Sequence, residues 1–169
     1  MAAERMSPPG RVRRATWADL PVICQLGAVL QAQHHQAAPE LFTAVTDPMR
    51  DAEFWQLRLQ RQEAGEGAFW LWQVDGQVVA LLVARLLDER SMPHLQPMLA
   101  CQIQSVAVLL PWQGQGIGHA LLQQVDDWAR EQGAQEMRLD VFQFNQHAIG
   151  LYQRCGYQSR LQHMSKRLA

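Results

Sequence analysis

The chain has 169 residues, yet it contains only one lysine, Lys166, and three cysteines. The cysteines, Cys24, Cys101 and Cys155, are scattered and odd in number, which excludes a disulfide framework and the paired spacing of a zinc site. We expect them to be reduced, mostly buried small side chains. We expect no bound metal.

Long apolar runs are also missing. No segment reaches the roughly 18–20 apolar residues that a membrane span requires. The N-terminus, MAAERMSPPGRVRR, has no apolar core typical of a signal peptide. We therefore expect a soluble, cytoplasmic protein without a membrane partner.

Net charge is nearly absent too, because 15 basic residues face 16 acidic ones. A net charge of −1 provides no positive field that would attract nucleic acid. A hydrophobic share of 48% and a charged share of 18% are typical of a globular chain of one domain. We expect residues 1–10, which contain Pro8-Pro9-Gly10, to be a flexible lead-in, and 11–169 to form a single domain.

The local patterns predict a mixed α/β order. Thr16, with Asp19 three residues later, is typical of a helix start. Asp75-Gly76 joins two β-prone runs and predicts a tight hairpin, because such a link needs positive φ. The second run is apolar on both faces, which indicates a central strand covered by helices on both sides. We expect strands at 12–15, 68–74, 77–86, 102–109 and 137–142, helices from Thr16 to about 34 and at 47–62, 116–132 and 145–155, a long loop at 88–99, and one or two short strands at the end.

The informative segment is 106–119, where a strand runs into glycines and the glycines run into the strongest predicted helix. Backbone N–H groups at a helix start have no internal partner and point outward together. With the helix dipole they form a site for an anion such as phosphate. Gly114, Gly116 and Gly118 lack the Cβ atoms that would keep a diphosphate away. A tight turn without a ligand is the plainer alternative.

Two kinds of phosphate ligand do not fit this segment. A nucleoside-triphosphate loop needs Gly followed by Lys-Ser or Lys-Thr, whereas the one lysine lies far downstream. A dinucleotide fingerprint, G-x-G-x-x-G, would need a glycine where His119 stands. What remains is the spacing Gln113-x-x-Gly116-x-Gly118.

This spacing resembles the (Arg or Gln)-x-x-Gly-x-(Gly or Ala) motif of the GNAT-type N-acetyltransferase superfamily. A second block is similar to the family pattern Asn-x-x-Ala-x-x-Leu-Tyr-x-x-x-Gly-(Phe or Tyr), and it consists of Asn145, Ala148, Leu151, Tyr152, Gly156 and Tyr157. The resemblance covers about 11–169. It implies a GNAT-like α/β fold: a mixed, mostly antiparallel central sheet of six to seven strands, about four flanking helices, and a splayed parallel strand pair that binds the coenzyme.

The resemblance also implies acetyl-coenzyme A as donor and a primary amine, of a small molecule or a peptide, as acceptor. The pantetheine would lie beside the strand, the diphosphate on the backbone amides of the turn, Asn145 against the pantetheine arm and Tyr152 near the sulfur. The coenzyme-binding residues implied in this way are Val106, Ala107, Val108, Gln113, Gly114, Gln115, Gly116, Ile117, Gly118, His119, Asn145 and Tyr152.

Transfer to an amine poses two proton problems. The ammonium, with a pKa near about 10, must lose a proton before it attacks, and the departing thiolate is helped by an acid. Tyr152 suits the acid role, against the alternative of a half-buried packing aromatic. Asp140 matches the position of a glutamate base in one branch of the family, against the alternative of a structural carboxylate. Gln102 and Gln104 could instead position a water chain.

The acceptor is not named by the sequence. By the resemblance, the loops at about 34–46 and 88–99 should form its pocket, with His34, His35 and Glu40 as candidates, although a solvated helix end explains the histidines as well. Trp17, Trp70 and Trp72 could line the pocket, but packing is the favoured interpretation. No residue is typical of an acyl carrier, which favours direct transfer.

Two other functions remain open at this point. One is a catalytically inactive, coenzyme A-binding regulatory domain of the same fold, and the other is a transferase of a longer acyl group. Because dimers are common in the family, a homodimer is an expectation.

Overall fold

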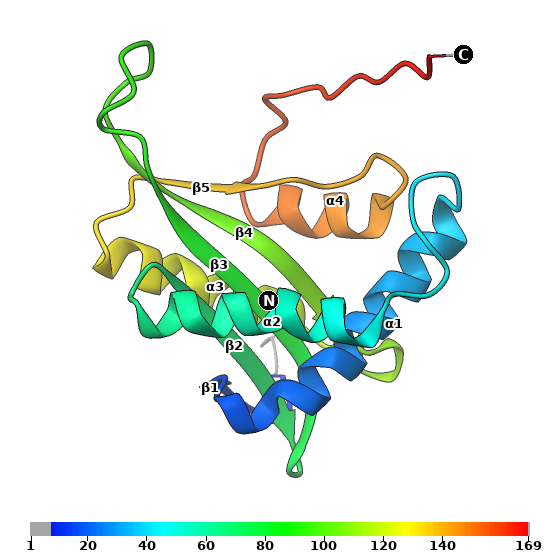
Figure 1. Cartoon of the computed structure of the whole chain (residues 1–169). Coiled ribbons are helices and arrows are strands. Elements are labelled where there is room, and N and C mark those ends of the chain that lie inside the picture. Colours follow the sequence, from blue (N-terminus) through cyan, green and yellow to red (C-terminus); the bar gives the residue numbers. More distant parts are fainter. Residues whose placement is uncertain (1–7, 169) are drawn as a thin grey trace, which may run out of the picture.

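Within residues 8–168, which the computed structural model describes, five strands form one mixed sheet in the order β1-β2-β3-β4-β5 (Figure 1). The first four pair antiparallel, and β5 pairs parallel with β4. The α/β, mostly antiparallel class is confirmed, whereas the expected six to seven strands exceed the number found. The strands are β1 (Arg11–Arg14), β2 (Gly67–Val74), β3 (Gln77–Asp88), β4 (Leu99–Val108) and β5 (Glu136–Leu139).

Helices cover both faces of the sheet. Alternate residues of β2 separate the two cores, since Phe69 and Leu71 pack with α1 and α2, whereas Trp70 and Trp72 pack with α3. Both tryptophans are buried, as the packing interpretation predicts. The helical elements are η1 (Trp17–Asp19), α1 (Leu20–Ala37), α2 (Pro48–Glu63), η2 (Leu110–Trp112), α3 (Ile117–Glu131) and α4 (Gln146–Arg154).

The hairpin between β2 and β3 turns at Asp75 and Gly76, with φ of 47° and 84°, as the sequence predicts. Farther along β3, the register against β4 shifts between Val83 and Ala84, which leaves Gln104 without a Cα partner. Such bulges bend a strand and redirect its side chains. The bulge lies beside the site described below.

The parallel pair of β4 and β5 parts halfway along β4. Its last paired residues are Ile103 and Leu139, yet β4 continues to Val108. Among the described residues, the stretch from Gln104 to Val108 therefore has a strand on one edge only. The chain after β5 turns instead toward the start of α4 (Figure 1).

Several expected boundaries are wrong. The first helix runs to Ala37, so His34 and His35 lie in its last turn rather than in the following loop. The strand expected at 137–142 ends at Leu139. The loop between β3 and β4 projects at one side of the molecule and the connection between α1 and α2 lies at the other (Figure 1), so the two do not form a common pocket.

No strand follows α4 within the described residues, and the expected C-terminal strands are wrong. Alternating side chains can mark a strand, but a strand exists only where a neighbour pairs with its backbone. Leu161 and Met164, which lie in this segment, are each 83% exposed. The chain runs away from the sheet here (Figure 1).

At the other end, residues 1–7 of the expected lead-in lie outside the described residues. Pro9 is held by the sheet, because its carbonyl accepts a hydrogen bond of 2.7 Å from the Trp72 indole. Within 8–168, no helix is both long and apolar enough to cross a bilayer.

The predicted helix start at Thr16 is confirmed, because Thr16 and Asp19 form a capping box at the start of η1. The Asp19 carboxylate accepts hydrogen bonds from the Thr16 backbone N–H and hydroxyl, at 2.8 and 2.9 Å. Both terminal nitrogens of Arg13 donate to it, at 2.7 and 2.8 Å. These hydrogen bonds, that from Arg13 foremost, lower the pKa of Asp19 from 3.8 to about 2.

Replacing Asp19 with asparagine should therefore lower the free energy of unfolding at pH 7 by about 2 kcal/mol. Because the folded-state pKa is depressed, this stability is present above pH 4 and is lost as the pH falls toward 2. Urea unfolding of both proteins at several pH values checks the loss. Asp88→Asn is the control, since its pairing with Arg90 is exposed and should matter little. An Asp19→Asn deficit that persists unchanged at pH 2 would contradict the assignment.

Candidate functional site

The glycine-rich turn places a row of free backbone amides at the start of α3. Gly116 is the N-cap residue with φ of 85°, a left-handed conformation that favours glycine. Among residues 8–168, no protein acceptor pairs with the backbone N–H of any residue from Gly114 to His119. The space that a Cβ on Gly116 would enter is open, with Pro8 Cβ the nearest atom at 4.0 Å. This arrangement suits an anion.

The two glutamines of the turn brace it. Gln113 donates from its side-chain amide to the Val108 carbonyl at 2.9 Å, and Gln115 donates to the Pro111 carbonyl at 3.0 Å. The turn is thereby tied to the end of β4. Gln113 and Gln115, both predicted to bind the coenzyme, thus have side chains that shape the loop.

Gly118 lets α3 and α4 approach each other closely, and Asn145 caps the start of α4. A Cβ on Gly118 would come within 3.2 Å of Leu151 Cδ2, so glycine permits the close approach of the two helices. The predicted N-cap at Asn145 is confirmed, because its side chain accepts from the Ala148 backbone N–H at 3.2 Å. The contact of Asn145 with the coenzyme stays a prediction.

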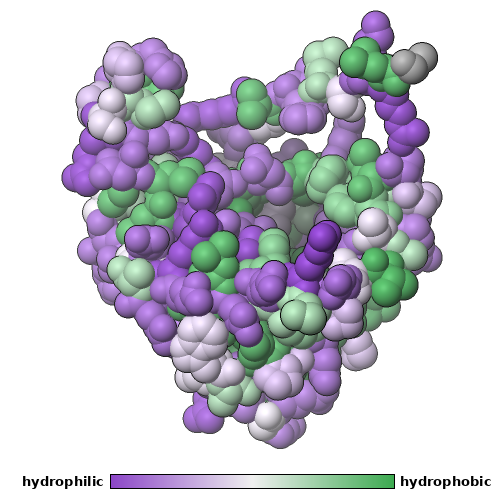
Figure 2. Space-filling model, viewed as in Figure 1, coloured by the Kyte–Doolittle hydropathy of each residue, from purple (hydrophilic) through white to green (hydrophobic). Residues whose placement is uncertain are grey.

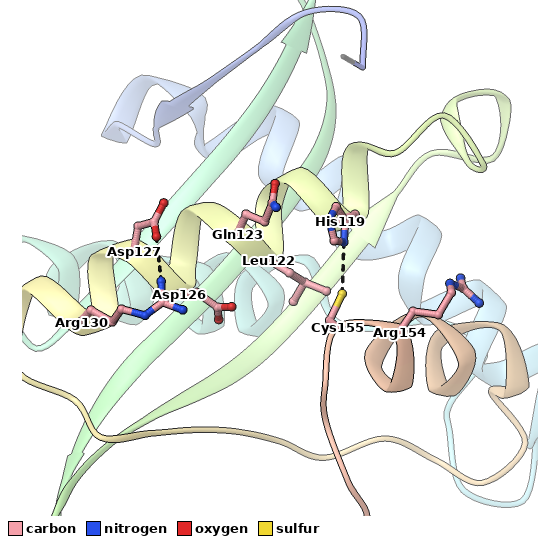
Figure 3. Close-up of a pocket in the computed structure, with 8 residues that line it drawn as sticks. All are labelled: His119, Leu122, Gln123, Asp126, Asp127, Arg130, Arg154 and Cys155. Carbon is pink, nitrogen blue, oxygen red and sulfur yellow. Dashed lines mark hydrogen bonds and ion pairs between the residues drawn. The ribbon is translucent and has the colours of Figure 1, made fainter. Parts of the chain in front are cut away.

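His119 turns its ring away from the free amides. Its Nδ1 lies 3.3 Å from the Cys155 sulfur, and both line a surface hollow of about 480 Å³ between α3 and the end of α4 (Figure 3). Figure 3 shows Arg154 pointing away from this contact and Arg130 paired with Asp127. His119 therefore contributes its backbone N–H to the row of free amides, while its ring joins the two helices.

Tyr152 lies on α4 and packs, half-buried, against the core that also contacts Val106 and Val108. Its ring centroid is 5.9 Å from that of Tyr157. Burial, and then the neighbouring Cys155, raise the pKa of the Tyr152 hydroxyl above 10. The phenol therefore stays protonated at neutral pH, as a proton donor must.

Asp140 lies on the other side of β4 from Tyr152, in a cavity of about 300 Å³ that Arg58 of α2 also lines. Its Oδ2 accepts a hydrogen bond from the Gln102 side chain at 3.1 Å. Gln104 lines the same cavity. The structure thus gathers the three residues that sequence reasoning proposed for the base or for its water chain.

Sequence reasoning missed two other residues of this cavity, Arg58 on α2 and Arg85 on β3. An arginine inside the apolar run of β3 was the one available signal. Nothing in the pattern of α2 distinguishes Arg58 from the other arginines of that helix, because only packing brings it over the sheet.

None of the three free cysteines suits an acyl carrier. Burial raises the pKa of the Cys101 thiol to about 12. Burial and Asp126 raise that of Cys155, and burial and Asp51 raise that of Cys24. The thiolate is the nucleophile, so these protonated groups are poor ones. Within 8–168, no three His, Cys, Asp or Glu side chains gather as a metal site would need.

The two histidines proposed for the acceptor pocket instead hold the end of α1. His34 Nδ1 lies 2.9 Å from the Leu30 carbonyl, and His35 Nδ1 lies 2.7 Å from the Phe42 carbonyl. The His34 ring packs in an aromatic cluster with Phe42, Phe142 and Phe144. This cluster joins the connection after α1 to the chain between β5 and α4. Glu40, exposed in that connection, accepts at its backbone carbonyl from Arg167.

A mixed sheet with a parted β4–β5 pair, and free amides at the helix start beside it, define an α/β protein with a glycine-rich turn next to an open strand edge. Residues 30–157 match the model of the acetyltransferase (GNAT) family, and the chain belongs to that family.

Three comparisons illustrate the likeness. The uncharacterized N-acetyltransferase YdgE of Bacillus subtilis (strain 168) is 36% identical over 74 residues, 44% of this chain and 47% of that protein, so the chain spans about half of its length. A mutant BH1408 protein of Bacillus halodurans has a TM-score of 0.82 at 20% identity, covering 94% of this chain and 99% of that one. Aminoglycoside N-acetyltransferase AAC(6')-Iy in complex with CoA has a TM-score of 0.72 at 16% identity, covering 96% of this chain and 97% of that one. At such identities these structures establish the fold.

Proposed function

We propose that the protein transfers the acetyl group of acetyl-coenzyme A directly to a primary amine. The observation that carries this proposal is the row of unpartnered amides from Gly114 to His119, placed beside the open edge of β4. A diphosphate needs several N–H donors at once, and an extended pantetheine needs a strand edge. One ligand, coenzyme A, has both parts in sequence. The structural neighbour in complex with CoA supports the same ligand.

The residues of this chain fit the coenzyme along its length. The amides of Gly114, Gln115, Gly116, Ile117, Gly118 and His119 would hold the diphosphate, in a loop braced by Gln113. The edge at Val106, Ala107 and Val108 would pair with the amides of the pantetheine. Asn145, at the start of α4, would contact the pantetheine arm.

Proton transfer is assigned to residues on two sides of β4. Asp140, directly or through a water held by Gln102 and Gln104, takes a proton from the acceptor ammonium. The free amine attacks the thioester carbonyl, the C–S bond breaks, and Tyr152 donates its proton to the departing sulfur. The nitrogen gives up its second proton to solvent as the amide forms, solvent returns a proton to Tyr152, and Asp140 releases the proton that it took. No acyl-enzyme forms, in keeping with the protonated cysteines.

Calorimetric titration with acetyl-coenzyme A and with free coenzyme A tests the proposal, followed by an assay of thiol release with a panel of amines. We expect both ligands to bind and thiol release to depend on an amine. Binding without thiol release for any amine would favour a regulatory domain that only binds coenzyme A. No binding by folded protein would overturn the proposal.

A further inference from the structure

The cavity that Arg58 and Asp140 line holds two arginines that form no ion pair within the described residues. Arg58 reaches it from α2 and Arg85 from β3. Their Nε atoms are buried, and neither has a hydrogen-bond acceptor in the described structure. Within 8–168, no carboxylate forms an ion pair with either guanidinium, although Arg13, Arg90, Arg130, Arg138 and Arg160 all have one. A buried donor without an acceptor is costly, so this pair calls for an explanation.

Packing holds Arg58 in place. Its Nη1 donates to the Phe54 carbonyl at 2.8 Å, and its guanidinium carbon lies 3.3 Å from the centroid of the Phe54 ring. Burial, and then the positive charges of Arg61 and Arg85, lower the pKa of Arg58 to about 10. The guanidinium is still charged at neutral pH. Two cations brought together in this way attract an anion strongly.

The opposite wall of the cavity differs in charge. Gln102 is the cross-strand partner of Arg85, and its side-chain amide donates to Asp140. A cationic pair and a carboxylate thus share one cavity, joined by the glutamine. Figure 2 shows a hollow just above α2 on this face, bordered by hydrophilic and hydrophobic residues. A molecule carrying both an amino group and an anionic group complements these walls.

We propose that the acceptor amine carries an oxyanion, a carboxylate or a phosphate, which Arg58 and Arg85 bind while Asp140 faces its amino group. This rests on the proposed function, because Asp140 belongs to the reaction site. Guanidinium groups match oxyanions with paired hydrogen bonds. A cavity of about 300 Å³ lies at the low end for ligand sites, so the acceptor is small. Polycations such as aminoglycosides are disfavoured by the two arginines.

Matched acceptors test the proposal with acetyl-coenzyme A in excess. Amino acids are compared with their carboxamides, phosphoethanolamine with ethanolamine, and spermidine serves as the polycation. We expect kcat/KM to be about 10- to 100-fold higher for the oxyanion-bearing member of at least one pair, the range for hydrogen bonds to a charged group. The pair that shows the preference distinguishes carboxylate from phosphate.

Variants locate the preference. In Arg58→Gln and Arg85→Gln, the ratio between oxyanion-bearing and neutral acceptors should fall close to one. Arg61→Gln removes the same charge from the same helix without touching the cavity, and it should keep the wild-type ratio. Affinity for acetyl-coenzyme A and the unfolding temperature establish that each variant is folded. A selectivity ratio separates recognition from a merely structural role.

Binding gives a second readout that needs no turnover. N-acetylated amino acids, their carboxamides and N-acetylphosphoethanolamine are titrated into the coenzyme A complex while the Nε signals of the arginines are followed by NMR. The signals of Arg58 and Arg85 are assigned by their absence from the spectra of the two variants. They should shift only when the ligand carries an oxyanion. Three results would overturn the inference if acetyl-coenzyme A still binds: equal rates for charged and neutral acceptors, a preference for spermidine, or no shift of the Nε signals. Each of them leaves the proposed function standing. Failure to bind acetyl-coenzyme A overturns both.

Discussion

Replacing Gly116 with aspartate should reduce the affinity for acetyl-coenzyme A by more than about 100-fold. The new carboxylate would lie at the start of α3, where it accepts hydrogen bonds from the amides that would otherwise bind the diphosphate. It also adds a negative charge where an anion must bind. The helix itself should persist, because aspartate is a favoured N-cap residue, although its φ of 85° costs some stability. Calorimetric titration measures the loss.

The chain offers a matched control at the other end of α3. Gly133 has φ of 81°, and a Cβ added to it would meet no atom within 4 Å, so Gly133→Asp carries similar backbone strain far from the amides. It should bind acetyl-coenzyme A like the wild type, while its unfolding temperature falls by about as much as that of Gly116→Asp. Equal affinities of the two variants would mean that the glycine-rich turn is only a turn.

Replacing Tyr152 with phenylalanine should lower kcat by about 100-fold, within the range for a lost general acid. The affinity for coenzyme A should hardly change, because the ring remains. Since burial raises the pKa of Tyr152, its proton is retained below pH 10. Any decline of the wild-type rate from ionisation of this group should therefore begin at a higher pH than an exposed tyrosine would give. Steady-state kinetics by thiol release, with the best acceptor, measures both effects.

Tyr157 supplies the comparison for that variant. Its hydroxyl is buried without a hydrogen-bond partner in the described structure, and burial raises its pKa. Tyr157→Phe removes the same atom from the adjacent ring, so turnover should stay at the wild-type level and stability should be equal or higher. If Tyr152→Phe turns over as fast as Tyr157→Phe, Tyr152 is not the acid.

Much of the fold was predictable because its signals are local. Helical spacing of apolar residues predicts α3, Asp75-Gly76 predicts the hairpin, and Thr16 with Asp19 predicts the start of the first helical turn. Each is decided by dihedral preferences or by contacts within a few residues. The glycine-rich turn was predictable for the same reason, since a strand, three glycines and a helix are adjacent in the chain.

The expected C-terminal strands, and the expected pocket between two loops, were wrong because each depends on a distant partner. A strand needs a neighbour to pair with, and among the described residues the four-residue β5 pairs with β4 alone. The aromatic packing of His34 likewise depends on Phe142 and Phe144, which lie more than a hundred positions downstream.

The sequence by itself determined the family, the order of the main elements and the glycine-rich turn with its free amides. The tertiary structure alone decided which charged groups lie together, because packing of α2 over the sheet brings Arg58, Arg85 and Asp140 into one cavity. These residues come from a helix, a strand and a loop that are far apart in the chain. The interaction between their charges depends on how close the side chains lie in space, and no local sequence pattern encodes that distance.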